Sequence, residues 1–314
     1  MKLLFFLLLS ISLSCQTTKQ NAKNTDKGVK LIVLGNVQDA GSPQVGCKKE
    51  CCADFWKHPD MSRKIISIGV IDHDLRENYL FDISPDFTQQ IQMLQEHAGT
   101  SEKTTPDGIF ITHAYIGHYT GLMYLGKEAM NSTNTPVYAM PKLKKYLENN
   151  GPWSQLVNTK NIIIKDIQNE VPVKLSLNIQ VTPIQVPHRD EFSETVGFMI
   201  EGPKKKALFI PDIDKWNKWK HNITDIIKNV DYAFLDATFY DAEEIGFRDV
   251  SEIPHPFVVE SMELFKNLSA KDKKKIYFIH FNHTNKLLNK DSKQSKTVVA
   301  NGFNIARLGD EIEL

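Results

Sequence analysis

Short apolar runs, rich in Val, Ile, Phe and Tyr, recur along most of the chain and are separated by polar or turn-forming residues. Apolar runs of roughly four to eight residues that end at turn signals are typical of β-strands. Strands therefore dominate the expected secondary structure. The pattern predicts them at residues 30–34, 65–71, 78–82, 108–112, 136–139, 162–165, 179–186, 195–200, 207–210, 232–235 and 276–279.

Helical patterns are fewer, and the first of them begins only after several strands. It opens with a Ser84-Pro85 pair, which suits the N-cap and first turn of a helix. This order does not fit a strict alternation of strand and helix, so we expect two sheets packed face to face with helices outside. No internal repeat or long linker divides the chain, so residues 29–314 are expected to form one domain. The expected helices cover residues 84–97, 142–149, 222–230 and 256–267.

Composition and charge exclude some classes of partner. The 314-residue chain is 41% hydrophobic, which is enough for a sizeable core, and 38 Lys and Arg balance 38 Asp and Glu. A chain without net charge has no electrostatic footprint for nucleic acid and no generally cationic face for a membrane. We expect a small-molecule substrate, and an anionic one would have to be captured by local groups.

The N-terminus has the pattern of an export signal, a positive start and an apolar stretch too short to cross a bilayer as a mature helix. Ser14 directly before Cys15 resembles the lipobox of bacterial lipoproteins, although Ser12 stands where such boxes usually carry Leu. We expect residues 1–15 to be a lipoprotein-type signal with lipidation at Cys15, and residues 16–28 to be a polar tether. The protein would then be exported and held at a bacterial membrane by the lipid alone, facing the periplasm or the cell surface. An ordinary signal peptide and an uncleaved anchor are the alternatives.

Three further cysteines, Cys47, Cys51 and Cys52, lie close together in one loop. In an exported protein, three thiols leave one over if two of them form a disulfide. The odd count and the close spacing also fit a small structural zinc site that a histidine would complete. The sequence favours neither interpretation over the other.

Four of the predicted strands are each followed closely by at least one potential metal ligand. Because sheets gather the C-terminal ends of parallel strands at one edge, such side chains can meet although they are far apart in sequence. Imidazole and carboxylate groups bind zinc and iron, and a catalytic site needs roughly three protein ligands and an open position for water. The pattern predicts a metal centre built from His113, His118, His188, Asp212 and His280.

Several longer motifs surround these ligands and strengthen the interpretation. In chain order they are Asp39-Ala-Gly-Ser-Pro-Gln44 with the cysteines after it, Phe81-Asp-Ile-Ser-Pro-Asp86, Thr112-His-Ala-Tyr-Ile-Gly-His-Tyr-Thr-Gly-Leu122, Phe209-Ile-Pro-Asp-Ile-Asp-Lys-Trp216, Leu235-Asp-Ala-Thr-Phe-Tyr240 and Ile279-His-Phe-Asn-His-Thr-Asn285. Together they resemble the metallo-β-lactamase fold hydrolases, and within that superfamily the pyrroloquinoline quinone biosynthesis protein B group, from about Lys30 onward. The resemblance implies an α/β (α+β) fold of four layers, an αββα sandwich.

Two positions depart from the pattern that the resemblance implies. Where the superfamily usually reads His-x-His-x-Asp-His, this chain has Tyr115 in place of the second His and Gly117 in place of the Asp. With two ligands missing, a full two-metal site is doubtful and a single ion is the expectation. Two half-sites that share Asp212 remain an alternative. They would consist of His113 with His188 and of His118 with His280.

Tyr115 and Arg189 are the candidates for catalysis beyond the metal ligands. The Tyr115 phenol could coordinate the ion, donate a hydrogen bond to a substrate oxyanion, or pack over the site. An unassisted phenol stays protonated at neutral pH, which favours donation. Arg189 could bind a carboxylate or phosphate through its planar fork, or form a surface ion pair with Asp190 or Glu191.

Four other polar residues are expected near the centre. Asp82 and Asp236 also follow strands and could hold imidazoles in the tautomer that binds metal, although an Asp at such a place also caps turns. His255 could border the cleft, and His283 is close enough to His280 in sequence to exchange roles with it.

Three functions are compatible with these features, and a metal-dependent hydrolase is the preferred one. A hydroxide generated on the ion would attack an ester, phosphodiester, amide or lactam. The resemblance implies an alternative, an iron-dependent oxygenase acting on a tyrosine-like substrate, but export argues against cofactor assembly, which is normally cytoplasmic. The third is a binding or carrier protein without catalysis, which the departures at Tyr115 and Gly117 would explain. Zinc is the expected cofactor, as one or two ions, with iron as the alternative.

Overall fold

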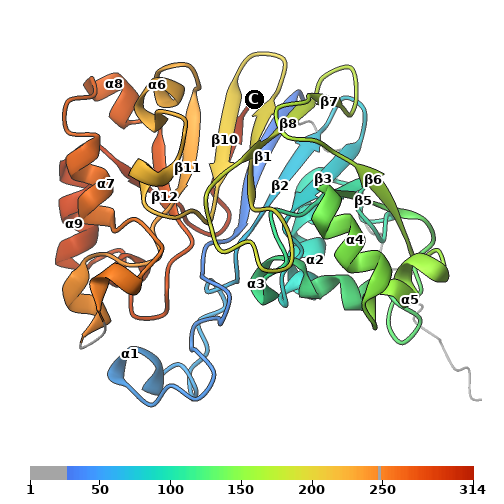
Figure 1. Cartoon of the computed structure of the whole chain (residues 1–314), viewed down its shortest axis with the longest axis horizontal. Helices are drawn as coiled ribbons and strands as arrows, with labels where there is room; N and C mark the ends of the chain where they lie inside the picture. The colour runs from blue at the N-terminus through green and yellow to red at the C-terminus, as the bar shows by residue number, and fades with distance from the viewer. Residues whose placement is uncertain (1–26, 247–248) are drawn as a thin grey trace, which may run out of the picture.

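In the computed structural model, which describes residues 27–246 and 249–314, two seven-stranded sheets pack face to face and helices cover both outer faces (Figure 1). The strands are β1 (Val29–Gly35), β2 (Ser67–Asp72), β3 (Glu77–Phe81), β4 (Gly108–Phe110), β5 (Thr135–Ala139), β6 (Ile162–Asp166), β7 (Val173–Lys174), β8 (Gln180–Gln185), β9 (Val196–Glu201), β10 (Lys206–Ile210), β11 (Tyr232–Asp236), β12 (Ile276–Ile279), β13 (Asn304–Ile305) and β14 (Glu311–Glu313). The α-helices are α1 (Glu50–Ala53), α2 (Phe87–Ala98), α3 (Ile116–Tyr119), α4 (Pro141–Asn149), α5 (Trp153–Asn158), α6 (Ile223–Lys228), α7 (Val258–Leu264), α8 (Ala270–Lys273) and α9 (Lys293–Ala300). Short 3-10 helices are η1 (Thr120–Leu125), η2 (Trp216–Lys218), η3 (Ala242–Ile245), η4 (Val250–Glu252) and η5 (Lys286–Leu288).

The two sheets share one topology. The first has the order β14-β1-β2-β3-β4-β5-β6, in which β1 to β3 are antiparallel and β3 to β6 are parallel. The second has the order β13-β12-β11-β10-β9-β8-β7, in which β8 to β10 are antiparallel and β10 to β13 are parallel. Parallel strands end at the same edge of their sheet, so each sheet gathers several strand ends at one place.

Aromatic side chains fill the layer between the sheets. Phe81 and Phe110 of the first sheet stack with ring centroids 4.8 Å apart, and Phe198 of the second sheet meets both edge-on at 5.4 and 5.5 Å. Edge-to-face pairs of buried aromatic rings add to the stability that burial itself provides. The three rings belong to the core cluster that joins both sheets.

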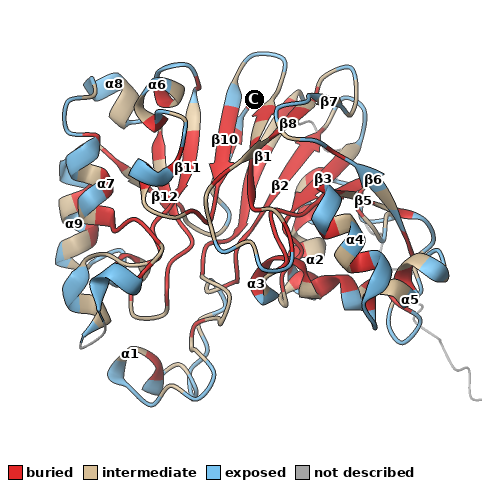
Figure 2. Cartoon of the chain, viewed as in Figure 1, coloured by how far each residue is buried: buried red, intermediate tan, exposed pale blue. Residues whose placement is uncertain are grey.

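Each outer sheet face carries its own apolar layer and helices (Figure 2). On the first sheet, Phe87 and Leu94 of α2 pack on the buried face of the strands, together with residues of α4 and α5. On the second sheet, Ile227 of α6 and Val298 of α9 do the same. Three apolar layers between four layers of secondary structure make the αββα sandwich, so the predicted fold is confirmed.

A short segment after β1 joins the two sheets at their edge. Val37 forms parallel bridges both to Ile65, before β2, and to Phe281, after β12. The Ile66 amide donates to the Val37 carbonyl at 2.8 Å, and the Gln38 amide donates to the Phe281 carbonyl at 2.8 Å. The backbone that leads to Asp39 is therefore anchored to both sheets.

The structure contains each of the predicted strands and the four predicted helices, together with shorter elements that the pattern did not indicate. The strands β7, β13 and β14 have two or three residues each, too few for an apolar run. The helix α9 has only Ser295 and Val298 buried, so it lacks a strong apolar stripe.

No helix within residues 27–246 and 249–314 is long and apolar enough to span a membrane. The predicted signal sequence with Cys15, and most of the predicted tether, lie outside the described residues. They stay predictions.

Candidate metal centre

Residues from both sheets converge at the strand ends. The loop after β4 and the helix α3 carry two of the histidines, and the segments that follow β8, β10 and β12 carry the other ligands. All of these side chains are almost fully buried, with at most 2% of each exposed. They are the residues predicted from the sequence, His113, His118, His188, Asp212 and His280.

Asp212 lies in the middle of this group. Its Oδ2 is 3.4 Å from Nε2 of His113 and 3.9 Å from Nε2 of His118, while its Oδ1 is 3.4 Å from Nε2 of His188. On the far side, the imidazole rings of His118 and His280 have centroids 5.4 Å apart. One carboxylate thus faces imidazoles that come from both halves of the chain.

The atoms that face one another in this group are left without hydrogen bonds. Among the described residues, Nε2 of all four histidines and Oδ1 of Asp212 are buried and lack a hydrogen-bond partner. Buried polar atoms are nearly always satisfied, so a cluster of unsatisfied ones demands an explanation. A metal ion explains them, because neutral imidazole nitrogen and carboxylate oxygen are its ligands.

The spacing also fits a metal ion. Ligands at about 2.0 to 2.2 Å from a tetrahedral zinc lie about 3.3 to 3.6 Å from one another. The two separations of 3.4 Å from Asp212 to His113 and to His188 match this range. The two separations run to different oxygens of Asp212, so His113 and His188 could share one ion through both oxygens of that carboxylate. Ligand atoms of His113, His118 and Asp212 also lie within 4.8 Å of one another.

Asp82 and Thr112 fix the direction of His118. Nδ1 of His118 lies 2.7 Å from Oδ2 of Asp82, and an ionised carboxylate only accepts, so the proton is on Nδ1. The other oxygen of Asp82 accepts from the Thr112 amide at 2.8 Å, and the Thr112 hydroxyl also donates to it. Nε2 of His118, which lies 3.9 Å from Oδ2 of Asp212, is then the nitrogen that remains for a metal ion.

A similar pair lies at the end of β11 in the second sheet. The Thr238 hydroxyl donates to Oδ1 of Asp236 at 2.7 Å and lies 2.9 Å from Nδ1 of His280. Oδ2 of Asp236 lies 2.8 Å from Nδ1 of His255, a ring that is also 3.1 Å from Oδ1 of Asp212. Asp82 and Asp236 thus occupy the supporting positions expected for them, and His255 lies at the centre rather than at its border.

Two of these residues have backbones in the left-handed region. Asp82 has a φ of 61° and His280 a φ of 69°. Residues other than glycine rarely adopt this conformation, which costs about 1–3 kcal/mol and persists where the surroundings impose it. Both residues follow a parallel strand directly, so local strain is concentrated where the strands meet the centre.

Burial and the neighbouring charges set the protonation of the group. Burial, together with the nearby His118, lowers the pKa of His113 to about 4, which leaves a neutral imidazole. Burial acts in the same direction on His255, but the Asp236 and Asp212 carboxylates outweigh it and raise its pKa to about 10. Burial would raise the pKa of Asp212, yet His188 and His255 hold it well below its usual range. Asp212 is therefore an anion between imidazoles.

One polar group that the sequence did not single out also reaches the centre. Oδ1 of Asp39 lies 2.9 Å from Nε2 of His118 and 3.9 Å from Nε2 of His280. Asp39 was visible only as the first residue of a loop motif, because it follows no continuous apolar run. Its proximity to two histidines depends on the pairing of Val37 with both sheets.

The comparison with known protein families agrees with this geometry. A model of the β-lactamase superfamily domain matches residues 77–281 of the chain. The chain belongs to the β-lactamase superfamily. The predicted relationship is thereby confirmed.

Individual relatives share this fold at low sequence identity. Coenzyme PQQ synthesis protein B of Methylorubrum extorquens (strain PA1) is 24% identical over 305 residues, which cover 90% of this chain and 99% of the relative. The crystal structure of zinc-bound PqqB from Methylobacterium extorquens has a TM-score of 0.72 and 21% identity, with 91% of this chain and 100% of the other covered. A diphosphatase from the PhnP family has a TM-score of 0.62 and 20% identity, with 91% and 98% covered.

Tyr115 stands in the superfamily motif in place of a histidine, and its ring packs over the centre. The ring centroid lies 4.8 Å from that of His113 and 5.6 Å from that of His188. Its hydroxyl donates to the Arg189 carbonyl at 2.8 Å and also contacts the Glu191 carboxylate. The phenol proton is therefore engaged by the loop after β8, which favours packing over donation to a substrate.

Arg189 is exposed at the rim, with its guanidinium carbon 5.3 Å from the Tyr115 ring centroid. It lies outside the group of buried ligands, next to His188 in sequence. This position leaves its planar fork in contact with solvent, where an incoming anion would meet it.

The three thiols form a second candidate metal centre, at the segment that carries α1. Cys47, Cys51 and Cys52 are free, and their sulfur atoms are 3.9 to 4.0 Å apart along the series. A ligand atom of His283 lies within 4.8 Å of the three sulfurs, which completes a Cys3His set typical of structural zinc. From the sequence, His283 is expected as a possible substitute for His280, whereas the structure groups it with the thiols.

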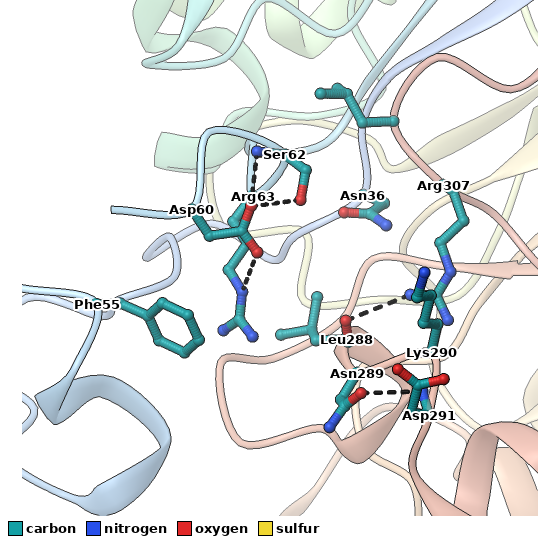
Figure 3. A pocket seen from close by; sticks show the side chains of 11 residues that line it. Asn36, Phe55, Asp60, Ser62, Arg63, Leu288, Asn289, Lys290, Asp291 and Arg307 are labelled. Carbon is teal, nitrogen blue, oxygen red and sulfur yellow. Dashed lines mark hydrogen bonds and ion pairs between the residues drawn. The ribbon is translucent and has the colours of Figure 1, made fainter. Parts of the chain in front are cut away.

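A cavity of about 500 Å³ lies between the α1 segment and the region after β12. Figure 3 shows Arg63 and Arg307 among the side chains that line it. The Arg63 guanidinium donates to Ser42 at 2.7 Å and lies 3.8 Å from the Phe55 ring centroid. Asn36 forms another wall, and its side chain donates to the Ala306 carbonyl at 2.8 Å. The cavity contains no ligand of the metal centre, and its Asn36 wall supports the segment that leads to Asp39.

Proposed function

We propose that the protein is a metal-dependent hydrolase that cleaves an ester, phosphodiester or amide-type bond of a small molecule. One observation carries the proposal. Four buried imidazole nitrogens and a carboxylate oxygen face one another without hydrogen bonds at the strand ends. Two proteins of the same fold support it, since one structure is described as zinc-bound and another as a diphosphatase.

The side chains of the centre would have separate roles in such a reaction. A bound divalent ion would lower the pKa of a water molecule and polarise the oxygen of the scissile bond. His113, His188 and Asp212 would hold the ion at the separations described above. Asp82 keeps the proton of His118 on Nδ1, and Thr238 contacts the corresponding nitrogen of His280. The exposed Arg189 would attract the anionic part of a substrate.

We also propose that the protein is exported and acts outside the cytoplasm, because residues 1–15 have the pattern of a lipoprotein-type signal sequence that ends at Cys15. The partner would be a small molecule on the outer side of the cytoplasmic membrane. Nucleic acid does not fit a chain whose charges balance.

The test uses the purified full chain, stripped with a chelator and reconstituted with Zn²⁺ or with Fe²⁺ under anaerobic conditions. Hydrolysis of bis(p-nitrophenyl) phosphate, a p-nitrophenyl carboxylic ester and a chromogenic lactam would be followed by absorbance. We expect at least one to be hydrolysed with zinc. His188→Ala should lower kcat/KM at least 100-fold, because it removes one of three ligands.

The matched control is His221→Ala. His221 is a partly exposed histidine that pairs with Glu170 outside the centre, so its loss should leave turnover unchanged. Oxygen consumption with iron and a tyrosine-type substrate, without hydrolysis, would favour an oxygenase instead. Metal binding without turnover on any of these substrates would indicate a binding protein.

A further inference from the structure

Gly117 leaves a space that the side chain of another residue fills. A Cβ atom on residue 117 would lie 2.2 Å from Oδ1 of Asp39 and 2.6 Å from its Cα. Real Cβ atoms do not approach other atoms so closely, and backbone atoms of Asp39 cannot move aside as the end of a flexible side chain could. A side chain at position 117 and Asp39 in its present place exclude each other. Asp39 therefore brings a carboxylate to the place at which the motif of the superfamily has an Asp and this chain has Gly117.

The Asp39 carboxylate is placed as a ligand would be. Its Oδ1 is buried and has no hydrogen-bond partner among the described residues, as is also true of Nε2 in His118 and in His280. It lies 2.9 Å from the first of these nitrogens and 3.9 Å from the second. The three atoms all lie within 4.8 Å of one another, and the Asp39 side chain is only 14% exposed.

The backbone before Asp39 holds it firmly. Val37 is paired with both sheets, and the Gln38 amide donates to Phe281, the residue after His280. The Gly41 amide donates back to the Gln38 carbonyl at 2.9 Å and closes the turn. Asp39 thus emerges from a segment whose position relative to His280 is fixed by hydrogen bonds, which is what a preorganised ligand needs.

One ion cannot satisfy all of the unpaired atoms. An ion held by His113, His188 and Asp212 leaves the buried nitrogens of His118 and His280 and the oxygen of Asp39 without partners. Ligands of a tetrahedral zinc are about 3.3 to 3.6 Å apart, and separations of 2.9 and 3.9 Å lie on either side of that range.

We propose that Asp39, His118 and His280 hold a second metal ion, and that the Asp39 carboxylate substitutes for the one missing at Gly117. Asp212, whose Oδ2 is 3.9 Å from His118, would then be in reach of both ions. The centre is then a two-ion site, in contrast to the single ion expected from the sequence. The proposal rests on the proposed metal centre and does not depend on which bond is cleaved.

Zinc content of the full chain tests the proposal. Wild type, Asp39→Asn, Gly117→Asp and the swapped double variant D39G/G117D would be stripped, dialysed against buffered Zn²⁺ and analysed by atomic emission. We expect Asp39→Asn to bind one ion fewer per chain than wild type. Gly117→Asp should also lose zinc, because its side chain collides with Asp39, and the double variant should recover the wild-type count.

Two controls separate a ligand from a structural carboxylate. Asp86→Asn alters a carboxylate that accepts from the Ile65 amide at 2.8 Å and belongs to none of the candidate metal-binding groups among the described residues, so the zinc count should not change. His188→Ala should remove the other ion and leave the Asp39 site filled. In addition, zinc should raise the melting temperature of Asp39→Asn less than that of wild type, whereas the metal-free proteins should melt alike.

An unchanged zinc count and affinity in Asp39→Asn would overturn the proposal, since Asp39 would then only be a counter-ion of His118. The swap decides the question even if a single variant folds poorly. A folded D39G/G117D chain with the full count supports it, and one that is an ion short overturns it. Two bound ions without hydrolysis would leave Asp39 as a ligand and refute only the hydrolase.

Discussion

At the scale of single residues, the two carboxylate oxygens of Asp82 make different contacts, one with the backbone of the fold and one with a histidine of the metal centre. Oδ1 accepts the Thr112 amide and Oδ2 accepts Nδ1–H of His118, both within 2.8 Å. This division makes the effect of an isosteric substitution specific. The amide of Asn can keep the first contact through its oxygen, but its NH₂ group then faces His118.

We predict that Asp82→Asn weakens zinc binding about 10- to 100-fold while the chain still folds. The NH₂ group needs an acceptor, so it would favour the His118 tautomer that has its proton on Nε2, where the ion should bind. Competition with a chromophoric chelator would measure the dissociation constant. Asp225→Asn, at an exposed Asp of α6 that pairs with Lys228, is the control. A dissociation constant within twofold of wild type would show that Asp82 has no influence on the ligand.

Some residues of the metal centre could be predicted from the sequence, and others could not. His113, His188 and His280 could be predicted as neighbours because each closely follows an apolar strand, and strand ends converge. Asp39 could not, because its position depends on the bridges of Val37 to two distant segments. The grouping of His283 with the thiols could not be predicted for a related reason, since spacing along the chain does not tell toward which neighbour a loop residue turns.

At the scale of elements, the short helix η3 carries a carboxyl group with an unusual titration. Glu244 accepts from the Tyr240 amide at 2.7 Å and from the Thr284 hydroxyl. Burial raises the pKa of Glu244 to about 7, against the opposing effect of these hydrogen bonds, while Asp241 adds to the rise and Lys286 opposes it.

We predict that Glu244 makes the protein less stable as the pH rises from about 4.5 to above 7. The folded state keeps this proton up to about pH 7, whereas the unfolded chain loses it near pH 4.5, so the stabilisation is complete below the unfolded pKa and is lost through the folded one. The loss amounts to about 3 kcal/mol, at about 1.4 kcal/mol per pKa unit. Urea unfolding of the metal-free protein between pH 5 and 8 would measure it.

Glu244→Gln should remove this part of the pH dependence, while the exposed neighbour Glu243 provides the control variant Glu243→Gln. Parallel stability curves for wild type and Glu244→Gln across this range would mean that the Glu244 carboxyl group does not titrate there.

The strands differed in how well they could be predicted from the sequence. Strands that lie between two apolar layers are continuous runs of Val, Ile, Leu and Phe, and all of these were predicted. The short strands β13 and β14 were not, because they depend on pairing with β12 and β1 and not on their own pattern. The pairing of β14 with β1 also returns the C-terminus to the first sheet.

At the scale of the whole molecule, Phe198 links the sheets by meeting Phe81 and Phe110. We predict that Phe198→Ala lowers the free energy of unfolding by about 3–5 kcal/mol, through lost burial and the cavity that remains. Because Phe81 directly precedes Asp82, and Phe110 lies two residues before Thr112, zinc affinity should fall as well. Urea unfolding and chelator competition would measure the two effects.

Phe192→Ala is the matched control, because this ring is 56% exposed and lies outside the core. Its unfolding free energy should change by less than about 1 kcal/mol. A similar loss in both variants would mean that the aromatic layer does not hold the sheets together.

The residues of the metal centre come from both halves of the chain, so a bound ion would also connect the two sheets. Asp39, His113 and His118 come from the first half of the chain, whereas His188, Asp212 and His280 come from the second. Each half alone would be an incomplete chelator. If the backbone were cut between β6 and β7, a bound cation would add to the apolar layer and the β1–β14 pairing that hold the fragments together, so metal supply would strengthen assembly as well as permit reactivity.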